Sequence, residues 1–109
     1  MSKFKLISIR LTEEELKAIQ KYREENRIDI AVFVREIIKE LLLQDYRDTK
    51  QVLIETHNKY LSKSHSVRDK NFKIRLDAFT GEIFKEICNE NNVSYTSVIR
   101  GFIFDEIYS

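Results

Sequence analysis

The sequence predicts a mainly α-helical fold built around one two-stranded antiparallel ribbon. Two stretches alternate apolar with polar residues, LISIRLT at residues 6–12 and NFKIRLD at residues 71–77, and such alternation is typical of half-buried strands. After each stretch, apolar residues recur at helical spacing in two segments. The stretches and their helical segments match at one constant offset of 65 residues, which indicates a strand–helix–helix unit that occurs twice.

The first unit is expected to place two capped helices directly after its strand. Thr12 and Glu15 form a capping box, in which each side chain accepts a hydrogen bond from an amide at a helix start, and they predict a helix over residues 13–25. Asn26 is expected to take the left-handed conformation that ends this helix. Asp29 then caps a second helix, whose wide apolar stripe requires cover from two sides.

The second unit repeats the first without a gap. The predicted boundaries are residues 1–44 for the first copy and residues 68–109 for the second, both within one folded body. Asp77 and Ser94 stand at the two capping positions of the second copy.

Residues 45–67 predict a helical connector between the copies. Neither glycine nor proline interrupts them, and the pattern permits either a continuation of the preceding helix or a new helix near residues 49–61. Residues 62–66 read SKSHS, which is typical of a joint. His57 and His65 have no Cys or carboxylate cluster near them, so we expect solvated linker residues and no metal site.

The repeated unit is too small to fold alone. About 40 residues cannot bury a sufficient core, and a single strand has no partner for its backbone amides and carbonyls. Both problems disappear when the two strands pair antiparallel and four helices close over their apolar face. We therefore predict an intramolecular pseudo-dimer, with pairing of each unit to another chain as the alternative.

Composition places the chain among folded proteins. Hydrophobic residues make up 42% and charged residues 34%, which is not a disordered composition. No run approaches the roughly 18 apolar residues of a membrane span, and the start, Met1-Ser2-Lys3, predicts no signal peptide. The single Cys88 excludes an internal disulfide and fits the cytoplasm. We expect a half-buried helix residue there, with a bridge to another chain as the alternative.

Positive charge is concentrated in the two strand segments, although the net charge is only +1. Residues 1–11 and 68–76 together carry one acid, Asp69, against seven bases, which leaves the rest of the chain net acidic. This polarity favours an anionic partner that meets the strands.

These residues resemble the ribbon-helix-helix transcription regulators. The first copy carries Ile-x-Ile-Arg-Leu-Thr before a Glu-rich helix, and the second carries Phe-Lys-Ile-Arg-Leu-Asp followed later by Asn-Val-Ser-Tyr-Thr-Ser-Val-Ile-Arg. The resemblance covers residues 3–44 and 68–109, and the tandem arrangement is similar to tandem regulators of archaeal viruses. It implies double-stranded DNA as the partner, with the ribbon in the major groove, and a cytoplasmic location (the host cytoplasm for a viral protein).

The resemblance also implies which residues read bases. The side chains on the outer face of the ribbon are expected to touch base edges: Leu6, Ser8, Arg10, Asn71, Lys73 and Arg75. Leu6 stands where the family usually has a polar residue, so we expect it to touch a thymine methyl group or nothing. Because the outer residues of the two strands differ, a non-palindromic site is expected.

DNA phosphates are expected at the start of each second helix, where backbone amides form an anion site. The residues implied there are Ile30, Ala31, Ser94, Tyr95 and Thr96, and we add the lysines Lys3, Lys5 and Lys70. The carboxylate of Asp29 repels a phosphate, so the second copy is expected to contribute more to affinity.

Single basic residues on strands are usually solvated, and only their joint occurrence beside two helix caps favours DNA. Arg35 and Arg100 are interpreted differently, as structural residues that pair with acids or carbonyls near a helix start.

Three classes of function remain. The first is a sequence-specific regulator, most simply a repressor that occludes a promoter. The others are a non-specific architectural DNA-binding protein and an antitoxin-like interaction module. No enzyme or cofactor is expected, because no nucleophile–base pair, metal cluster or Gly-rich phosphate loop occurs. The apolar connector residues either support association of copies along DNA or cover the core: Val52, Leu53, Ile54 and Tyr60.

Overall fold

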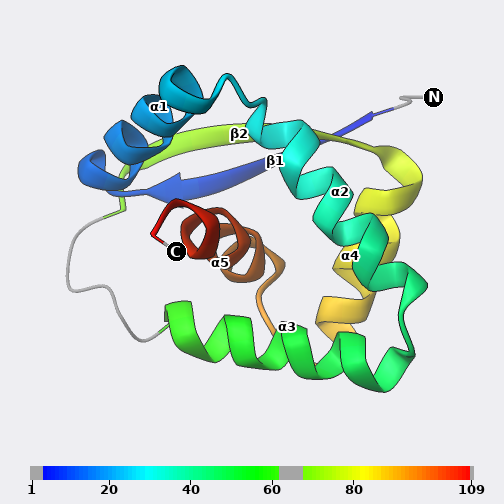
Figure 1. Cartoon of the computed structure of the whole chain (residues 1–109). Helices are drawn as coiled ribbons and strands as arrows, with labels where there is room; N and C mark the ends of the chain where they lie inside the picture. Colours follow the sequence, from blue (N-terminus) through cyan, green and yellow to red (C-terminus); the bar gives the residue numbers. More distant parts are fainter. Residues whose placement is uncertain (1–3, 62–67, 109) are drawn as a thin grey trace.

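The computed structural model describes residues 4–61 and 68–108, without the side chains of residues 60 and 61. The predicted joint at residues 62–66 lies outside the described residues. The described ranges form two strands and five helices (Figure 1): β1 (Phe4–Leu11), α1 (Glu13–Asn26), α2 (Ile30–Leu43), α3 (Tyr46–Leu61), β2 (Lys70–Asp77), α4 (Ala78–Glu90) and α5 (Tyr95–Ile107). A mainly helical chain with a two-stranded antiparallel ribbon is therefore confirmed.

β1 and β2 pair antiparallel along their whole lengths and give the ribbon one buried and one exposed face. Ser8 lies directly opposite Lys73, and these two residues also occupy equivalent positions of the sequence repeat. The centre of the ribbon therefore lies between two residues that correspond in the repeat. The inner face is almost completely buried and consists of Ile7, Ile9, Leu11, Ile74 and Leu76, with Phe72 half-buried beside them.

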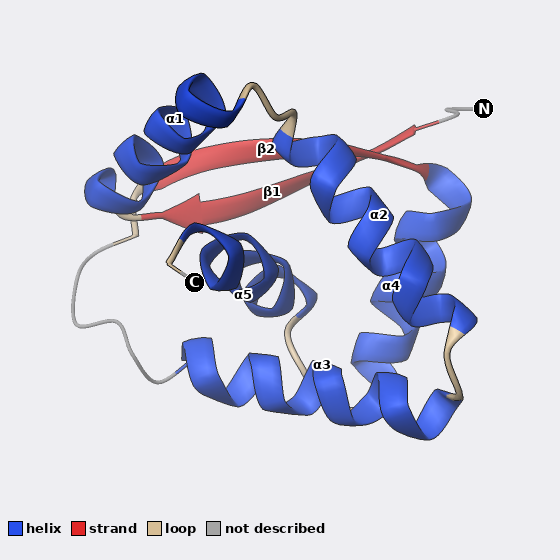
Figure 2. Ribbon diagram, viewed as in Figure 1, coloured by secondary structure: helices blue, strands red, loops and turns tan. Residues whose placement is uncertain are grey.

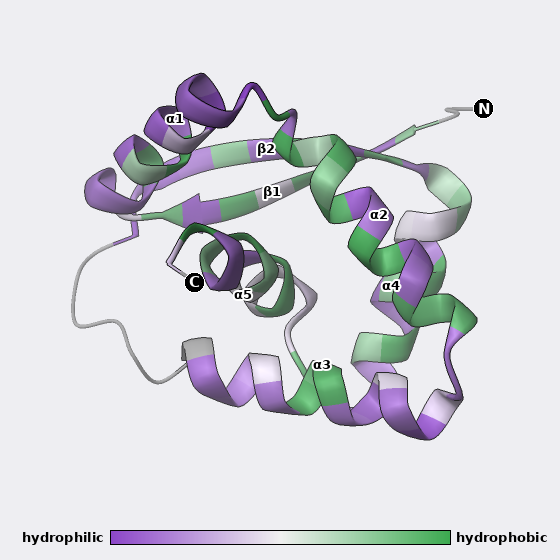
Figure 3. Ribbon diagram, in the orientation of Figure 1, coloured by the Kyte–Doolittle hydropathy of each residue, from purple (hydrophilic) through white to green (hydrophobic). Residues whose placement is uncertain are grey.

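Four helices cover the inner face in an exchanged arrangement. α5 packs on β1 and α2 packs on β2, while α1 contacts α5 and α4 contacts α2 (Figures 1 and 2). Figure 3 shows that α1 is largely hydrophilic, as expected for a helix with one narrow buried side, whereas α5 is largely hydrophobic. Because each strand is covered by a helix from the other half of the chain, neither half has a complete core by itself.

α3 is a new helix rather than a continuation of α2, which decides between the two expectations for the connector. It runs along the side of α5 that faces away from the ribbon (Figure 1). Leu53 is fully buried there, and the Thr49 hydroxyl donates a 2.6 Å hydrogen bond to the Leu41 carbonyl. Val52 and Ile54 are half-buried against the same core. These three residues therefore cover the core, whereas the side chain of Tyr60, the fourth apolar connector residue of the prediction, lies outside the described structure.

The predicted starts of the four capped helices are confirmed, but α3 begins at Tyr46 rather than near residue 49, and the predicted end of α1 is wrong. Arg27, not Asn26, takes the left-handed conformation, with φ at 51°, because α1 includes Asn26, whose side-chain amide donates to the Tyr22 carbonyl. Asn92 is left-handed at the equivalent place after α4. Four side chains accept hydrogen bonds from amides of the helices they cap: Thr12, Asp29, Asp77 and Ser94.

Asp77 makes stability dependent on pH. Its carboxylate accepts from both the hydroxyl and the amide of Thr80, and these bonds hold the pKa of Asp77 below its ordinary value of 3.8. A lowered folded-state pKa means stability that is present above the unfolded-state value and lost as the pH falls through the folded-state value. We expect Asp77→Ala to lower the free energy of unfolding by about 1 kcal/mol at pH 7, with the difference shrinking below pH ~4 in denaturant titrations.

The matched control for this effect is Thr12→Ala at the equivalent cap of α1. The Thr12 hydroxyl accepts from the Glu15 amide and does not titrate, so its loss should persist at low pH. A pH-independent loss for Asp77→Ala would contradict the assignment.

Cys88 is fully buried in α4 rather than half-buried as expected. Burial raises the pKa of its thiol to about 12. Because the thiolate is the reactive form, Cys88 acts as a small core residue and is poorly placed for a bridge to another chain.

Candidate nucleic-acid interface

The exposed face of the ribbon brings together all six residues predicted to read bases. They form three directly opposed pairs across the strands, and each of the six residues is exposed: Leu6 with Arg75, Ser8 with Lys73, and Arg10 with Asn71. The buried inner face fixes this outcome, because a slip of one residue in the strand register would turn every outer side chain into the core. Within these pairs there are three cations and no carboxylate.

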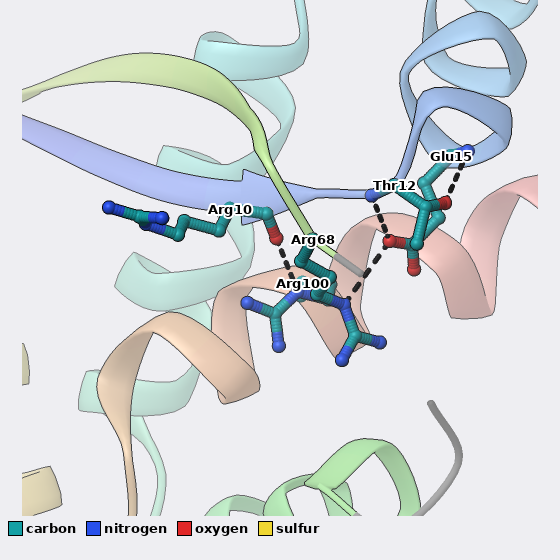
Figure 4. Close-up of polar contacts among 5 residues, drawn as sticks. All are labelled: Arg10, Thr12, Glu15, Arg68 and Arg100. Atoms are coloured by element: carbon teal, nitrogen blue, oxygen red, sulfur yellow. Dashed lines mark hydrogen bonds and ion pairs between the residues drawn. The ribbon is translucent and has the colours of Figure 1, made fainter. Parts of the chain in front are cut away.

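The Arg10 end of this face is held by a network below the ribbon (Figure 4). The buried Arg100 donates from Nε to the Arg10 carbonyl at 3.1 Å. Glu15 accepts the Thr12 amide at 2.8 Å and also Nε of Arg68 at 3.2 Å, which ties the end of β1 to the residues before β2. Figure 4 shows the Arg10 side chain extending away from this cluster. The backbone is anchored while the guanidinium stays exposed.

Arg100 is structural, as predicted, and its partner is a carbonyl at the end of β1. Burial, together with the nearby Arg68 guanidinium, lowers the pKa of Arg100 from its ordinary value. Arg35, the equivalent residue in the first copy, does not follow the prediction: its buried Nε has no hydrogen-bond partner among the described residues. The two ends of the ribbon are therefore anchored differently.

The Arg75 end carries a residue that the sequence patterns did not identify as functional. Phe4 lies on the exposed face with its ring centroid 5.5 Å from the Arg75 guanidinium carbon. Phe4 is 49% exposed and Leu6 is 57% exposed, so this end combines a cation with apolar surface. The alternation of the strand does place Phe4 on the same face as Leu6, and this signal could have found it.

The start of α2, predicted to contact phosphate, has one of its amides occupied by the protein itself. Asp29 Oδ1 accepts the Ala31 amide at 2.9 Å, so that amide is already occupied, and Ile30 is buried. A surface hollow beside this helix start is lined by basic and acidic side chains, including Arg23 and Glu24. The expected repulsion between Asp29 and a phosphate is consistent with this arrangement.

The start of α5 is occupied by groups of the protein as well. The Ser94 amide donates to Nδ1 of His57 on α3 at 3.1 Å, and the Ser94 hydroxyl oxygen accepts the Ser97 amide at 3.3 Å. Tyr95 and Thr96 are half-buried beside it. His57 is therefore not the solvated linker residue that we expected, because α3 packs along α5 and brings its imidazole to this helix start.

The three lysines predicted to contact phosphate fall in different places. Lys3 lies outside the described residues. Lys5 is half-buried on the inner side of β1, with its stem 3.4 Å from where a Cβ at Gly81 would stand. Lys70 is exposed at the start of β2, opposite Leu11. Lys70 alone remains a freely exposed phosphate candidate among the described lysines of this set.

Comparisons with protein-family models, with curated proteins and with solved structures find no match for the chain. Within residues 4–61 and 68–108, no helix has the length and apolar character needed to cross a membrane. The same ranges hold no group of three or more His, Cys, Asp or Glu side chains placed to bind a metal ion. The candidate site is therefore defined by the geometry of the exposed ribbon face alone.

Proposed function

We propose that this chain is a sequence-specific regulator of transcription that binds double-stranded DNA by inserting the β1–β2 ribbon into the major groove. In this proposal residues 1–44 and 68–109 act as the halves of a tandem ribbon-helix-helix pseudo-dimer. The supporting observation is the exposed face, on which three opposed pairs present three cations and no carboxylate. A repressor that occludes a promoter is the simplest role for such a protein.

The physical fit supports this proposal. The major groove of B-DNA is about 12 Å wide and admits a two-stranded ribbon. Arginine and lysine suit the O6 and N7 acceptors of guanine, asparagine suits adenine, and serine donates or accepts. All of these side chains stand on one face whose register is locked by the core behind it.

Selection of genomic fragments by the purified full chain, followed by footprinting at two salt concentrations, tests the proposal. We expect one discrete protected segment at both concentrations. Affinity should fall as salt rises, with a slope of about −0.9 for each phosphate neutralised. Uniform protection along all fragments would instead support an architectural DNA-binding protein. Recovery of no DNA would support an interaction module.

A further inference from the structure

Two arginines occupy equivalent positions at opposite ends of the exposed face but have different neighbours across the ribbon. Arg10 and Arg75 stand 65 residues apart in the sequence repeat. Asn71 lies directly opposite Arg10, whereas Leu6 lies directly opposite Arg75. An amide accompanies one arginine and an aliphatic side chain accompanies the other.

Phe4 adds a second difference between the ends. Its ring lies against Arg75, and neither Phe4 nor Leu6 is needed to fill the core, since both are about half exposed. The position equivalent to Phe4 in the second copy is Asp69, an exposed acid. The Arg75 end therefore exposes apolar side chains beside its arginine, whereas the Arg10 end exposes an amide and an acid near its arginine.

We propose that Leu6 and Arg75, with Phe4 as support, recognise a thymine next to a guanine. At the other end, Asn71 and Arg10 recognise an adenine next to a guanine. The two ends read different base pairs, so the protein binds its site in one orientation. This inference rests on the proposed insertion of the ribbon into the major groove.

The chemistry of the groove supports the assignment. Thymine presents a C5 methyl group, and adenine presents one acceptor and one donor. The Leu6 side chain has no polar atom and suits only the methyl group, whereas the Asn71 amide carries both a donor and an acceptor. Directly opposed residues have Cβ atoms about 5 Å apart, and stacked bases are about 3.4 Å apart. Each arginine and its neighbour therefore reach adjacent base pairs.

Phe4 is a positioning residue in this proposal. A guanidinium over an aromatic ring is attracted by the ring face, and a side chain that is already restrained loses less freedom when it binds. Arg10 has no ring beside it in the described structure, but its backbone is fixed by Arg100. The two arginines are thus oriented by different contacts.

A synthetic duplex that carries the selected site tests the methyl contact. Deoxyuridine replaces one thymidine at a time and removes only the C5 methyl group. One replacement is expected to weaken binding of the wild-type protein about fourfold, as for one buried methylene-sized group. Leu6→Ala should not respond to that replacement, and the control Asn71→Ala should respond like wild type. Unchanged wild-type binding at every replaced thymidine, or an equal response of Leu6→Ala, would overturn the inference.

Exchanging the two neighbours tests the orientation. The double variant Leu6→Asn with Asn71→Leu is expected to prefer a site in which the thymine and adenine positions are exchanged. Because two base pairs change, the preference should be at least the roughly 5- to 150-fold of one mismatched base pair. Both residues are exposed, so thermal unfolding should confirm that the variant keeps its fold. A folded double variant that keeps the wild-type preference would contradict the proposal.

The role of Phe4 is measured with 7-deazaguanine, which lacks the N7 acceptor. Phe4→Ala should reduce the penalty of this base at the Arg75 end only, and Phe4→Tyr should restore it. If 7-deazaguanine weakened binding of Phe4→Ala as much as binding of wild type, Phe4 would not position Arg75. Absence of any discrete site would defeat the proposed function itself, whereas a discrete site that is insensitive to deoxyuridine would defeat this inference alone.

Discussion

Replacing Leu53 with alanine is expected to lower the free energy of unfolding by about 2–5 kcal/mol, the range for truncation of a fully buried leucine. Leu53 is 0% exposed and lies on α3, where it packs into the core beside α5. The loss combines the removed apolar contact with the cavity left behind. Chemical denaturation monitored by circular dichroism measures it.

Leu43→Ala is the matched control, because the same side chain is removed from a position that is 87% exposed. Its effect should stay within about 0.5 kcal/mol. Similar stabilities for the two variants would mean that α3 is a detachable linker rather than a part of the core.

Arg75→Ala is expected to weaken binding to the selected site by about 1–3 kcal/mol, or roughly 5- to 150-fold. The exposed guanidinium lies over Phe4 on the face proposed to meet the bases, and Lys73→Ala on the same strand should have an effect of similar size. Titrations of labelled duplex at fixed salt measure the change, with an unrelated duplex to separate specific from non-specific loss.

Lys50→Ala is the control for net charge. Lys50 is exposed on α3, which lies on the far side of α5 from the ribbon, so its removal changes the charge but not the reading face. Equal affinities of Arg75→Ala and wild type for the selected site would exclude base reading by the ribbon.

The elements of the fold were accessible from the sequence because they depend on local rules. Alternation predicts the two strands, and the capping residues Thr12 and Asp77 predict where the helices after them begin. The antiparallel ribbon follows from the need of each strand for a partner. The exposure of Arg10 and Lys73 then follows from period-two geometry.

The remaining features depend on tertiary contacts, which local patterns do not encode. His57 is an unremarkable polar residue in the sequence, and only the packing of α3 against α5 brings it to the Ser94 amide. The pairing of Phe4 with Arg75 requires the strand register, which joins residues far apart in the chain. Arg27 is left-handed without glycine because α1 continues one residue beyond the expected end.

Because β1 pairs with β2 inside one chain, formation of the ribbon should not depend on protein concentration. A ribbon assembled from two chains exists only above a threshold concentration, because folding and dimerisation are then coupled. Here α3 and the residues after it join the two strands covalently, so completing the ribbon is a unimolecular step. The unfolding midpoint should therefore be the same at micromolar and at much lower protein concentrations. The ribbon would be complete from the first molecules made.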